Sequence, residues 1–274
     1  MDLATVTDYR LARRREDLRL PPDAAPSTVL VAGGTWVFSD PHVGVRTLVD
    51  LTGLGWPDLE PLPDGGLRVG ATCPIATLAA HPGPTGAPTL FRDAAAALLM
   101  SFKVQQVATV GGNVCLGLPA GAMTSVLAGL GAEAVVWTPG GGERRLPVGE
   151  LVVGVQRTAL RPGEVLRAVE VSGAAMRAPA SLRRIALTDH GRSAAVVVGT
   201  LADGTPRLVL TAAVTRPVVL TGGSPAELAE QVAGAGGWYD DPHGAPDWRA
   251  AMSARLVDEV LRDLDRLDGP GRTA

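Results

Sequence analysis

Residues 108–123 read ATVGGNVCLGLPAGAM, and four of these sixteen residues are glycine. The segment contains no acid, no base and no histidine, and its one thiol, Cys115, lies between apolar neighbours. Glycine loses more backbone freedom on folding than any other residue, so a glycine-rich segment is costly to order. The pattern indicates a segment whose main chain, and not its side chains, makes the functional contacts.

A second stretch follows the same scheme. In LVAGGTWV (30–37), Gly33 and Gly34 follow an apolar run and precede Thr35, and in VGGN (110–113) the glycine pair precedes Asn113, so that each pair is followed by a side chain able to donate a hydrogen bond. Gly-Gly after a strand lets the backbone adopt positive φ and turn successive amides toward one point, which forms an anion nest. Two such turns that converge predict a site for a pyrophosphate that needs neither lysine nor metal.

The glycine pairs also fit ordinary tight turns, because glycine makes up 34 of the 274 residues. Neither pair belongs to the Gly-x-Gly-x-x-Gly of a Rossmann turn or to a P-loop. On the pattern alone, ligand binding and a simple turn both stay open.

The composition is that of a globular protein with a large core: apolar residues make up 46% of the chain, and the mean hydropathy is +0.19. No apolar run reaches the ~20 residues that cross a bilayer, and the charged N-terminus does not fit a signal peptide. We therefore expect a cytoplasmic protein without a membrane partner. The net charge is −3, and the basic cluster Arg13–Arg15 is short and followed by acids, so we expect no nucleic-acid partner.

The use of cysteine and histidine argues against a metal centre in this chain. Cys73 and Cys115 do not form a Cys-x-x-Cys pair, and two free thiols are expected, although spacing alone leaves a disulfide open. The four histidines are scattered without metal-ligand spacing: His42, His81, His190 and His243. We expect no metal site and no catalytic side chain, so that any chemistry is borrowed from a cofactor or partner.

Short apolar runs that end at glycine, proline or polar turns predict strands. In the first part of the chain these runs cover 28–33, 45–51, 66–72, 133–138 and 164–171, and helical patterns cover 74–82, 89–102 and 119–132. After a break at 172–181, strand-like runs begin at 182, 193 and 206, and helices follow at 224–234 and 246–267. This mixture predicts an α+β fold with a domain boundary near residue 175.

Four motifs in this order resemble the FAD-binding medium subunit of the molybdenum hydroxylases, the family of carbon monoxide dehydrogenase and the flavin domain of xanthine dehydrogenase. They are LVAGGTWV (30–37), VRTLVDL (45–51), LRVGATCPIATLA (67–79) and ATVGGNVC (108–115). The resemblance implies a vanillyl-alcohol-oxidase (PCMH)-type FAD-binding domain of two α/β subdomains, followed by a smaller α+β C-terminal domain. The implied domains are 1–175, with subdomains of about 1–52 and 53–175, and 176–274.

The resemblance also implies that FAD is the cofactor and that two loops clasp its diphosphate through main-chain amides and small hydroxyls. The implied contacts are Leu30, Val31, Ala32, Gly33, Gly34, Thr35, Trp36 and Val37 in the first loop, Thr109, Val110, Gly111, Gly112 and Asn113 in the second, and Leu118 and Arg192 beyond them. Arg192 equally fits a structural ion pair.

The sequence departs from the resemblance where relatives carry Asp, at Trp36, Leu118 and Ala122. A lost charge-assisted hydrogen bond costs roughly 1.5–3 kcal/mol, and main-chain amides of LGLPAGAM are expected to contact the flavin instead. Trp36 either packs under its loop or stacks on the flavin, and packing is the expectation. The acidic and aromatic stretch WYDDPHGAPDW (238–248) fits either an interface or a packed turn.

The resemblance further implies the partners. They are a large subunit that binds molybdopterin and performs the hydroxylation, and a small subunit that carries two [2Fe–2S] clusters, which together with this chain form a heterotrimer. The flavin carries the redox chemistry, and the protein positions and tunes it. Two alternatives stay open: a stand-alone flavin oxidoreductase of the same fold, and a scaffold subunit without cofactor.

Overall fold

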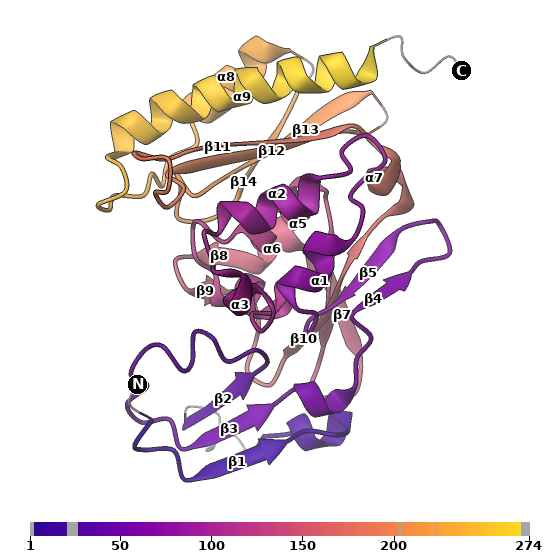
Figure 1. Cartoon of the computed structure of the whole chain (residues 1–274), viewed down its shortest axis with the longest axis vertical. Coiled ribbons are helices and arrows are strands. Elements are labelled where there is room, and N and C mark those ends of the chain that lie inside the picture. The colour runs from indigo at the N-terminus through magenta and orange to yellow at the C-terminus, as the bar shows by residue number, and fades with distance from the viewer. Residues whose placement is uncertain (1–2, 21–26, 203, 223, 270–274) are drawn as a thin grey trace.

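A parallel sheet forms one end of the molecule in the computed structural model, which describes residues 3–20, 27–202, 204–222 and 224–269. The remaining positions, including the first two and the last five of the predicted domains, lie outside the described residues. In this sheet β3 (Thr47–Asp50) lies between β1 (Asp8–Leu11) and β2 (Thr28–Val31), and both pairs are parallel. The loop from 32 to 46 connects β2 to β3, as Figure 1 shows.

A second, antiparallel sheet of five strands forms the middle of the molecule. Its order is β4 (Leu59–Pro61), β5 (Leu67–Gly70), β10 (Val165–Val171), β6 (Glu133–Trp137) and β7 (Glu143–Pro147). Near it lie α1 (Ile75–Ala80), α2 (Leu90–Ala97), α3 (Phe102–Gln105), α4 (Val110–Leu116), α5 (Ala122–Gly129) and α6 (Val148–Leu151). A short hairpin of β8 (Val152–Gly154) and β9 (Arg157–Thr158) follows, together with α7 (Gly173–Arg177) and the 3-10 turns Arg15–Leu18 and Thr52–Leu54.

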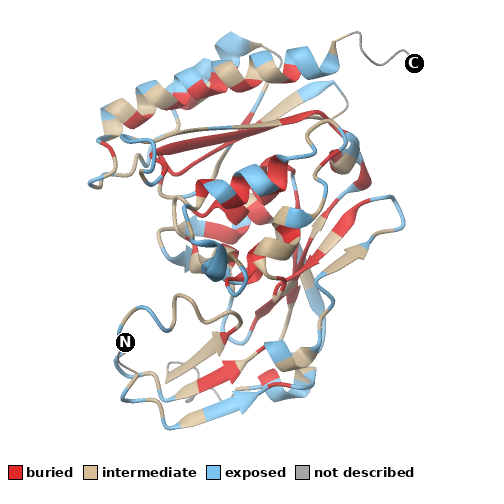
Figure 2. Cartoon of the chain, viewed as in Figure 1, coloured by how far each residue is buried: buried red, intermediate tan, exposed pale blue. Residues whose placement is uncertain are grey.

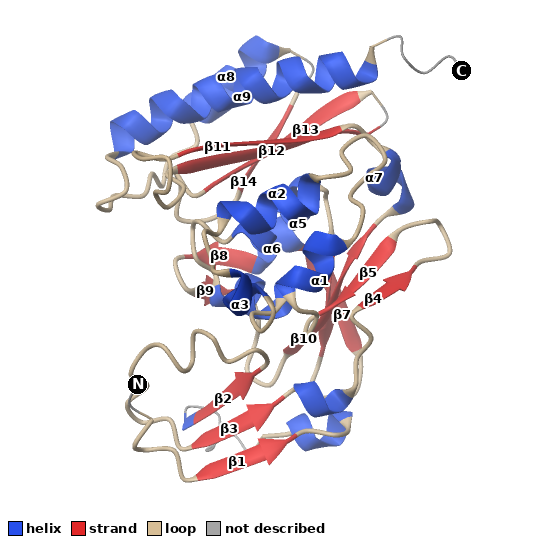
Figure 3. Cartoon of the chain, in the orientation of Figure 1, coloured by secondary structure: helices blue, strands red, loops and turns tan. Residues whose placement is uncertain are grey.

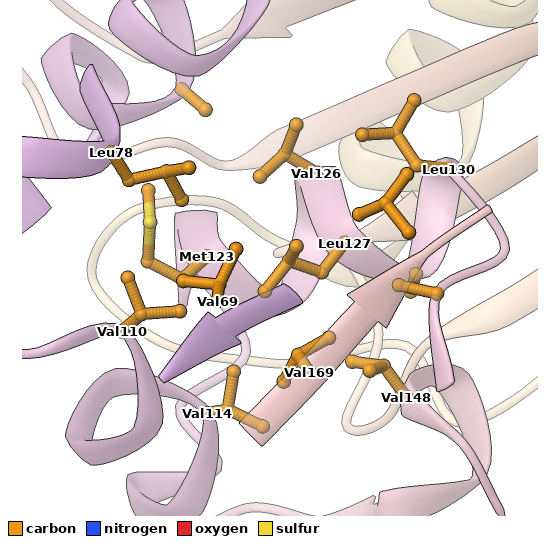
Figure 4. Close-up of a cluster of buried hydrophobic side chains, with 14 of the residues drawn as sticks. Val69, Leu78, Val110, Val114, Met123, Val126, Leu127, Leu130, Val148 and Val169 are labelled. Carbon is orange, nitrogen blue, oxygen red and sulfur yellow. The ribbon is translucent and has the colours of Figure 1, made fainter. Parts of the chain in front are cut away.

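The largest core joins this sheet to α4 and α5. Figure 4 shows Val69 of β5 and Val169 of β10 beside Val110 and Val114 of α4 and Met123 of α5. All five side chains are fully buried. Close packing of this kind fixes α4 and α5 against the sheet, so the glycine-rich segment that opens both helices stands on a rigid base.

A third sheet, also antiparallel, forms the other end of the molecule (Figure 3). Its order is β11 (Ala180–Ile185), β12 (Ala195–Ala202), β13 (Thr205–Thr211) and β14 (Val218–Thr221), and α8 (Pro225–Ala233) and α9 (Pro246–Asp268) cover one face. Figure 2 shows β12 buried along most of its length. Val197 packs toward the core of α8 and α9, whereas Val196 and Val198 pack toward Ala120, which explains the unbroken apolar run of this strand.

Most predicted elements are confirmed, with two corrections that matter for the site. The predicted helix 89–102 ends at Ala97, because Leu99 adopts φ 55°, and a separate short helix begins at Phe102. The second glycine pair does not follow a strand: Val110 opens helix α4. None of the described helices combines the length and apolar character that a membrane span requires.

Candidate cofactor site

A cavity of about 540 Å³ opens between the loop after β2 and the start of α4. Its volume lies within the range of small-molecule and cofactor sites. Its lining comes from segments far apart in the sequence: Val29–Val37 with His42, Ala97, Leu98 and Met100, residues of 108–121, Gln156 and Arg192. The lining therefore brings together β2 and the loop after it, the region from the end of α2 to the start of α5, the turn between β8 and β9, and the loop between β11 and β12.

The two glycine segments meet at the edge of this cavity. A Cβ atom on Gly33 would lie 1.9 Å from the carbonyl oxygen of Val107 and 3.2 Å from the Cα of Ala108. No side chain fits at position 33, because the first loop rests directly on the backbone that leads into the second segment. The convergence of the two segments agrees with the prediction from the sequence.

The first loop offers a row of amides that have no acceptor. Gly34 adopts φ +68°, and the backbone then turns so that Phe38 donates to the Gly34 carbonyl (2.8 Å) and Ser39 to the Trp36 carbonyl (2.9 Å). Among the described residues, no hydrogen bond is donated by the amides from Gly33 to Val37. Successive free amides in a turn of this kind form a binding site for an anion.

The second segment differs from the prediction of a strand followed by a positive-φ turn. Thr109 caps helix α4, since its Oγ1 accepts from the Gly112 amide at 3.1 Å, and neither Gly111 nor Gly112 has positive φ. Gly111 is required for packing: its Cβ would lie 2.6 Å from the carbonyl oxygen of Ala71. A side chain there would separate α4 from the backbone beside β5.

The amides of Val110 and Gly111 are therefore not available to a ligand. The Val110 amide donates to the carbonyl of Cys73, and the Gly111 amide donates to that of Ala71, each at 2.9 Å. Neither residue lines the cavity. In the structure both residues support the start of α4, and their direct contact with the cofactor stays a prediction.

The cap residue Thr109 and the α4 residues Gly112 and Asn113 instead line the cavity. Asn113 Oδ1 accepts from the Met123 amide at 3.1 Å and so caps α5, whose own N-cap position, Gly121, has no side chain. With its oxygen engaged, Asn113 is left with its Nδ2 donor for a ligand.

The LGLPAGAM segment lines the cavity through Leu118, Ala120 and Gly121. Gly117, at φ 62°, ends α4, and its carbonyl accepts from the Gln156 amide at 2.9 Å, which brings Gln156 to the cavity wall. Ala122 is buried as the first residue of α5 and is not part of the lining. Its methyl group faces the core, so it makes no contact with the space that a ligand would fill.

The charge around the cavity is positive. Arg192 lines it from the loop between β11 and β12, and no other Arg, Lys, Asp or Glu does among the described lining residues. In the part of the chain that the structure describes, Arg192 makes no ion pair, so the alternative of a structural ion pair is not seen. An exposed guanidinium without a protein partner suits recognition of an anionic ligand.

His42 is a lining residue that the sequence analysis missed. Its Nε2 is buried and has no hydrogen-bond partner among the described residues. Buried polar atoms in proteins are nearly always paired, so an orphaned nitrogen at a cavity wall indicates a ligand or water partner. No motif marks this position, because a lone histidine in a loop has no characteristic spacing.

Trp36 and Cys115 complete the lining with different chemistry. Trp36 is half-buried, borders the cavity and belongs to none of the described core clusters. Burial raises the pKa of the Cys115 thiol to about 12, so this sulfur stays protonated at neutral pH. Both cysteines are free thiols.

The sequence of residues 12–171 matches the family described as the FAD binding domain in molybdopterin dehydrogenase. The chain belongs to this family. FAD is accordingly its cofactor, and the cavity suits this group. Among the described residues, free amides, an unpaired guanidinium and an orphaned imidazole nitrogen line it, and no carboxylate does. A comparison with curated proteins finds no match.

Solved structures of similar fold match this chain over nearly its whole length. Carbon monoxide dehydrogenase from Hydrogenophaga pseudoflava, in a form lacking the Mo-pyranopterin moiety, matches with a TM-score of 0.82 and 18% identity, over 96% of this chain and 98% of that one. Reconstituted CO dehydrogenase from Oligotropha carboxidovorans gives 0.78 and 18%, over 94% and 97%. Quinoline 2-oxidoreductase from Pseudomonas putida 86 gives 0.76 and 20%, over 95% and 97%. These matches confirm the mixed helix and sheet fold.

Proposed function

We propose that this chain is the FAD-binding electron-transfer subunit of a molybdopterin-dependent hydroxylase complex. The observation that carries the proposal is the row of free amides from Gly33 to Val37, which faces a positively charged cavity in a chain of the FAD-binding family. The chemistry that FAD supplies when bound is the passage of electrons from [2Fe–2S] clusters on a partner to an external acceptor.

In this proposal the first loop holds the diphosphate. Five amides from Gly33 to Val37 and the Thr35 hydroxyl donate hydrogen bonds to phosphate oxygens, and Arg192 offsets their negative charge. Leu30, Val31 and Ala32 form the wall behind this loop. A diphosphate can be bound in this way without a metal ion.

The second segment completes the site in the same proposal. Thr109 and Asn113 donate from their side chains, and Gly112 lets the ligand approach α4 closely. Trp36 and Leu118 provide apolar surface for ring systems, and His42 donates or accepts through its free nitrogen.

In this proposal the substrate is converted on partner subunits and not on this chain. The cavity lining contains no Asp, Glu or Lys among its described residues, so a general acid or base other than His42 is not at hand. Two cysteines in the chain cannot ligate two [2Fe–2S] clusters, which need four ligands each. We therefore propose a small subunit with these clusters and a large subunit with molybdopterin as partners, in a cytoplasmic complex.

We also propose that the chain works as two domains, 1–175 and 176–274, with the first divided into about 1–52 and 53–175. The separate sheets support this division, and one core cluster, which contains Val197 and Val257, lies wholly within the second domain. Because Arg192 comes from the second domain and the loops from the first, FAD would bridge both domains.

The test is to purify the tagged chain from its native cells and to measure flavin, iron and molybdenum in the product. The proposal predicts one FAD per chain with iron and molybdenum in the same complex. Flavin without either metal, together with turnover by the chain alone, would instead support a stand-alone flavin oxidoreductase. Recovery of iron and molybdenum without flavin would support a scaffold subunit and contradict the proposed function.

A further inference from the structure

The acidic and aromatic stretch WYDDPHGAPDW (238–248) surrounds a buried arginine. Arg249, in the first turn of α9, is 1% exposed and is the largest fully buried side chain in the described chain. It forms an ion pair with Asp241, donates from Nε to the Gly244 carbonyl (2.8 Å), and lies 5.7 Å from the centre of the Tyr239 ring. The stretch is thus a packed turn around one guanidinium.

The same guanidinium reaches the ends of two strands. Arg249 Nη1 donates to the carbonyl of Ala194 (2.5 Å), directly before β12, and to the carbonyl of Ala212 (2.7 Å), directly after β13. Arg249 does not line the cavity. All three of its nitrogens donate to protein acceptors, in four hydrogen bonds.

Each of these two carbonyls belongs to a segment that leads to the cavity. Ala194 ends the loop that carries Arg192. Ala212 adopts φ 63°, which is costly for a residue other than glycine, and its amide donates to the Pro119 carbonyl at 2.7 Å. Pro119 stands between Leu118 and Ala120, and both of these line the cavity.

A buried ion pair is weak evidence for stability, because apolar residues of similar volume often stabilise a core as well. What an apolar residue cannot do here is hold the carbonyls of Ala194 and Ala212 at one fixed point. We propose that Arg249 is a positioning residue of the cofactor site. Through one guanidinium it sets the positions of Arg192 and of the Leu118–Ala120 segment relative to each other. This inference rests on the proposed role of both segments in FAD binding.

The test compares FAD affinity in Arg249→Met, Arg192→Ala and the double variant, measured by quenching of FAD fluorescence on the flavin-free full chain. Arg183→Met is the matched control, because Arg183 also pairs with a carboxylate of α9 (Asp263, 2.6 Å) but lies away from the cavity. We expect R249M and R192A each to raise the dissociation constant about tenfold, and R183M to leave it unchanged.

The double variant separates positioning from simple destabilisation. If Arg249 acts through Arg192, the two effects overlap and the double variant loses clearly less than the product of the single losses. Independent effects that multiply, or wild-type affinity in a folded R249M, would overturn the proposal. Should R249M fail to fold, Arg249→Lys and Asp241→Asn replace it. Each is again expected to weaken FAD binding, and wild-type affinity in a folded variant would again overturn the proposal.

A second readout does not depend on FAD and so keeps this inference apart from the proposed function. Hydrogen–deuterium exchange of the flavin-free chain is expected to be about tenfold faster in R249K than in the wild type at 186–194 and 117–121. Exchange in β5 and β10 is expected to stay unchanged. Equal exchange in R249K and in the wild type at 186–194 and 117–121 would contradict the positioning role even if FAD binds normally.

Discussion

Replacing Gly33 with alanine tests the contact on which the site is built. The added Cβ would lie 1.9 Å from the carbonyl oxygen of Val107 and 2.8 Å from its carbonyl carbon. Ordinary contacts of a Cβ begin at 3.4 Å, so the two segments must separate by 1.5 Å, the difference between these distances. Both atoms in the way belong to the backbone, which cannot swing aside as a side chain can.

A displacement of this size removes hydrogen bonds between the first loop and a bound phosphate, because such bonds fail beyond about 3.5 Å. Each hydrogen bond to a charged group contributes roughly 1.5–3 kcal/mol, so the loss of one raises the dissociation constant of FAD about ten- to hundredfold. The fold itself should survive, because overpacking typically costs about 1–3 kcal/mol.

The assay is titration of flavin-free Gly33→Ala with FAD, followed by calorimetry, together with thermal unfolding by circular dichroism. Gly140→Ala is the matched control: Gly140 does not have positive φ, and no atom lies within 4 Å of its added Cβ, so we expect no change in affinity. Wild-type affinity in a folded G33A variant would refute the reasoning, since the two segments would then be free to move without effect on the cofactor.

Three further predictions address single groups. Arg192→Ala is expected to change the free energy of unfolding by less than about 0.5 kcal/mol, since Arg192 lines the cavity and has no ion pair among the described residues. The same substitution should weaken FAD binding more at low salt than at high salt. A large loss of stability would contradict this prediction. His42→Leu is expected to weaken FAD binding about tenfold without destabilising the flavin-free chain, whereas His81→Leu, which also removes an orphaned buried nitrogen, should leave binding unchanged; equal effects would refute a contact. Burial raises the pKa of Cys73 and Cys115 from 9.0 to about 12, so thiols of the unfolded chain ionise first and stability falls as pH rises from 9 toward 12. Urea unfolding at pH 8 and 10 should show a smaller fall in Cys115→Ala, and an identical fall would count against the raised pKa.

Local signals in the sequence were enough to predict those elements whose ends are determined by neighbouring residues. Helix α8 begins as predicted, because Ser224 and Glu227 form a capping box and Pro225 fits the first helical position. Strand β2 and the turn at the glycine pair after it could also be predicted, because an apolar run followed by Gly-Gly is compatible with few other structures.

Long-range contacts set the features that the sequence did not reveal. Thr109 is readable as a helix cap only once it is known that Gly111 packs against Ala71, far away in the sequence. The orphaned nitrogen of His42 and the partners of Arg249 depend on how distant segments fold together. Pattern and propensity report on neighbours along the chain, whereas these contacts join residues that lie far apart in the sequence.

The central claim is that the loop after β2 and the start of α4 together hold the diphosphate of FAD. A crystal structure of the full chain with FAD tests it most directly. The account predicts phosphate oxygens within about 3.2 Å of amides between Gly33 and Val37, with Thr109 or Asn113 as further donors. A diphosphate bound elsewhere, or a loop from Gly33 to Val37 that stays free of the cofactor, would contradict it.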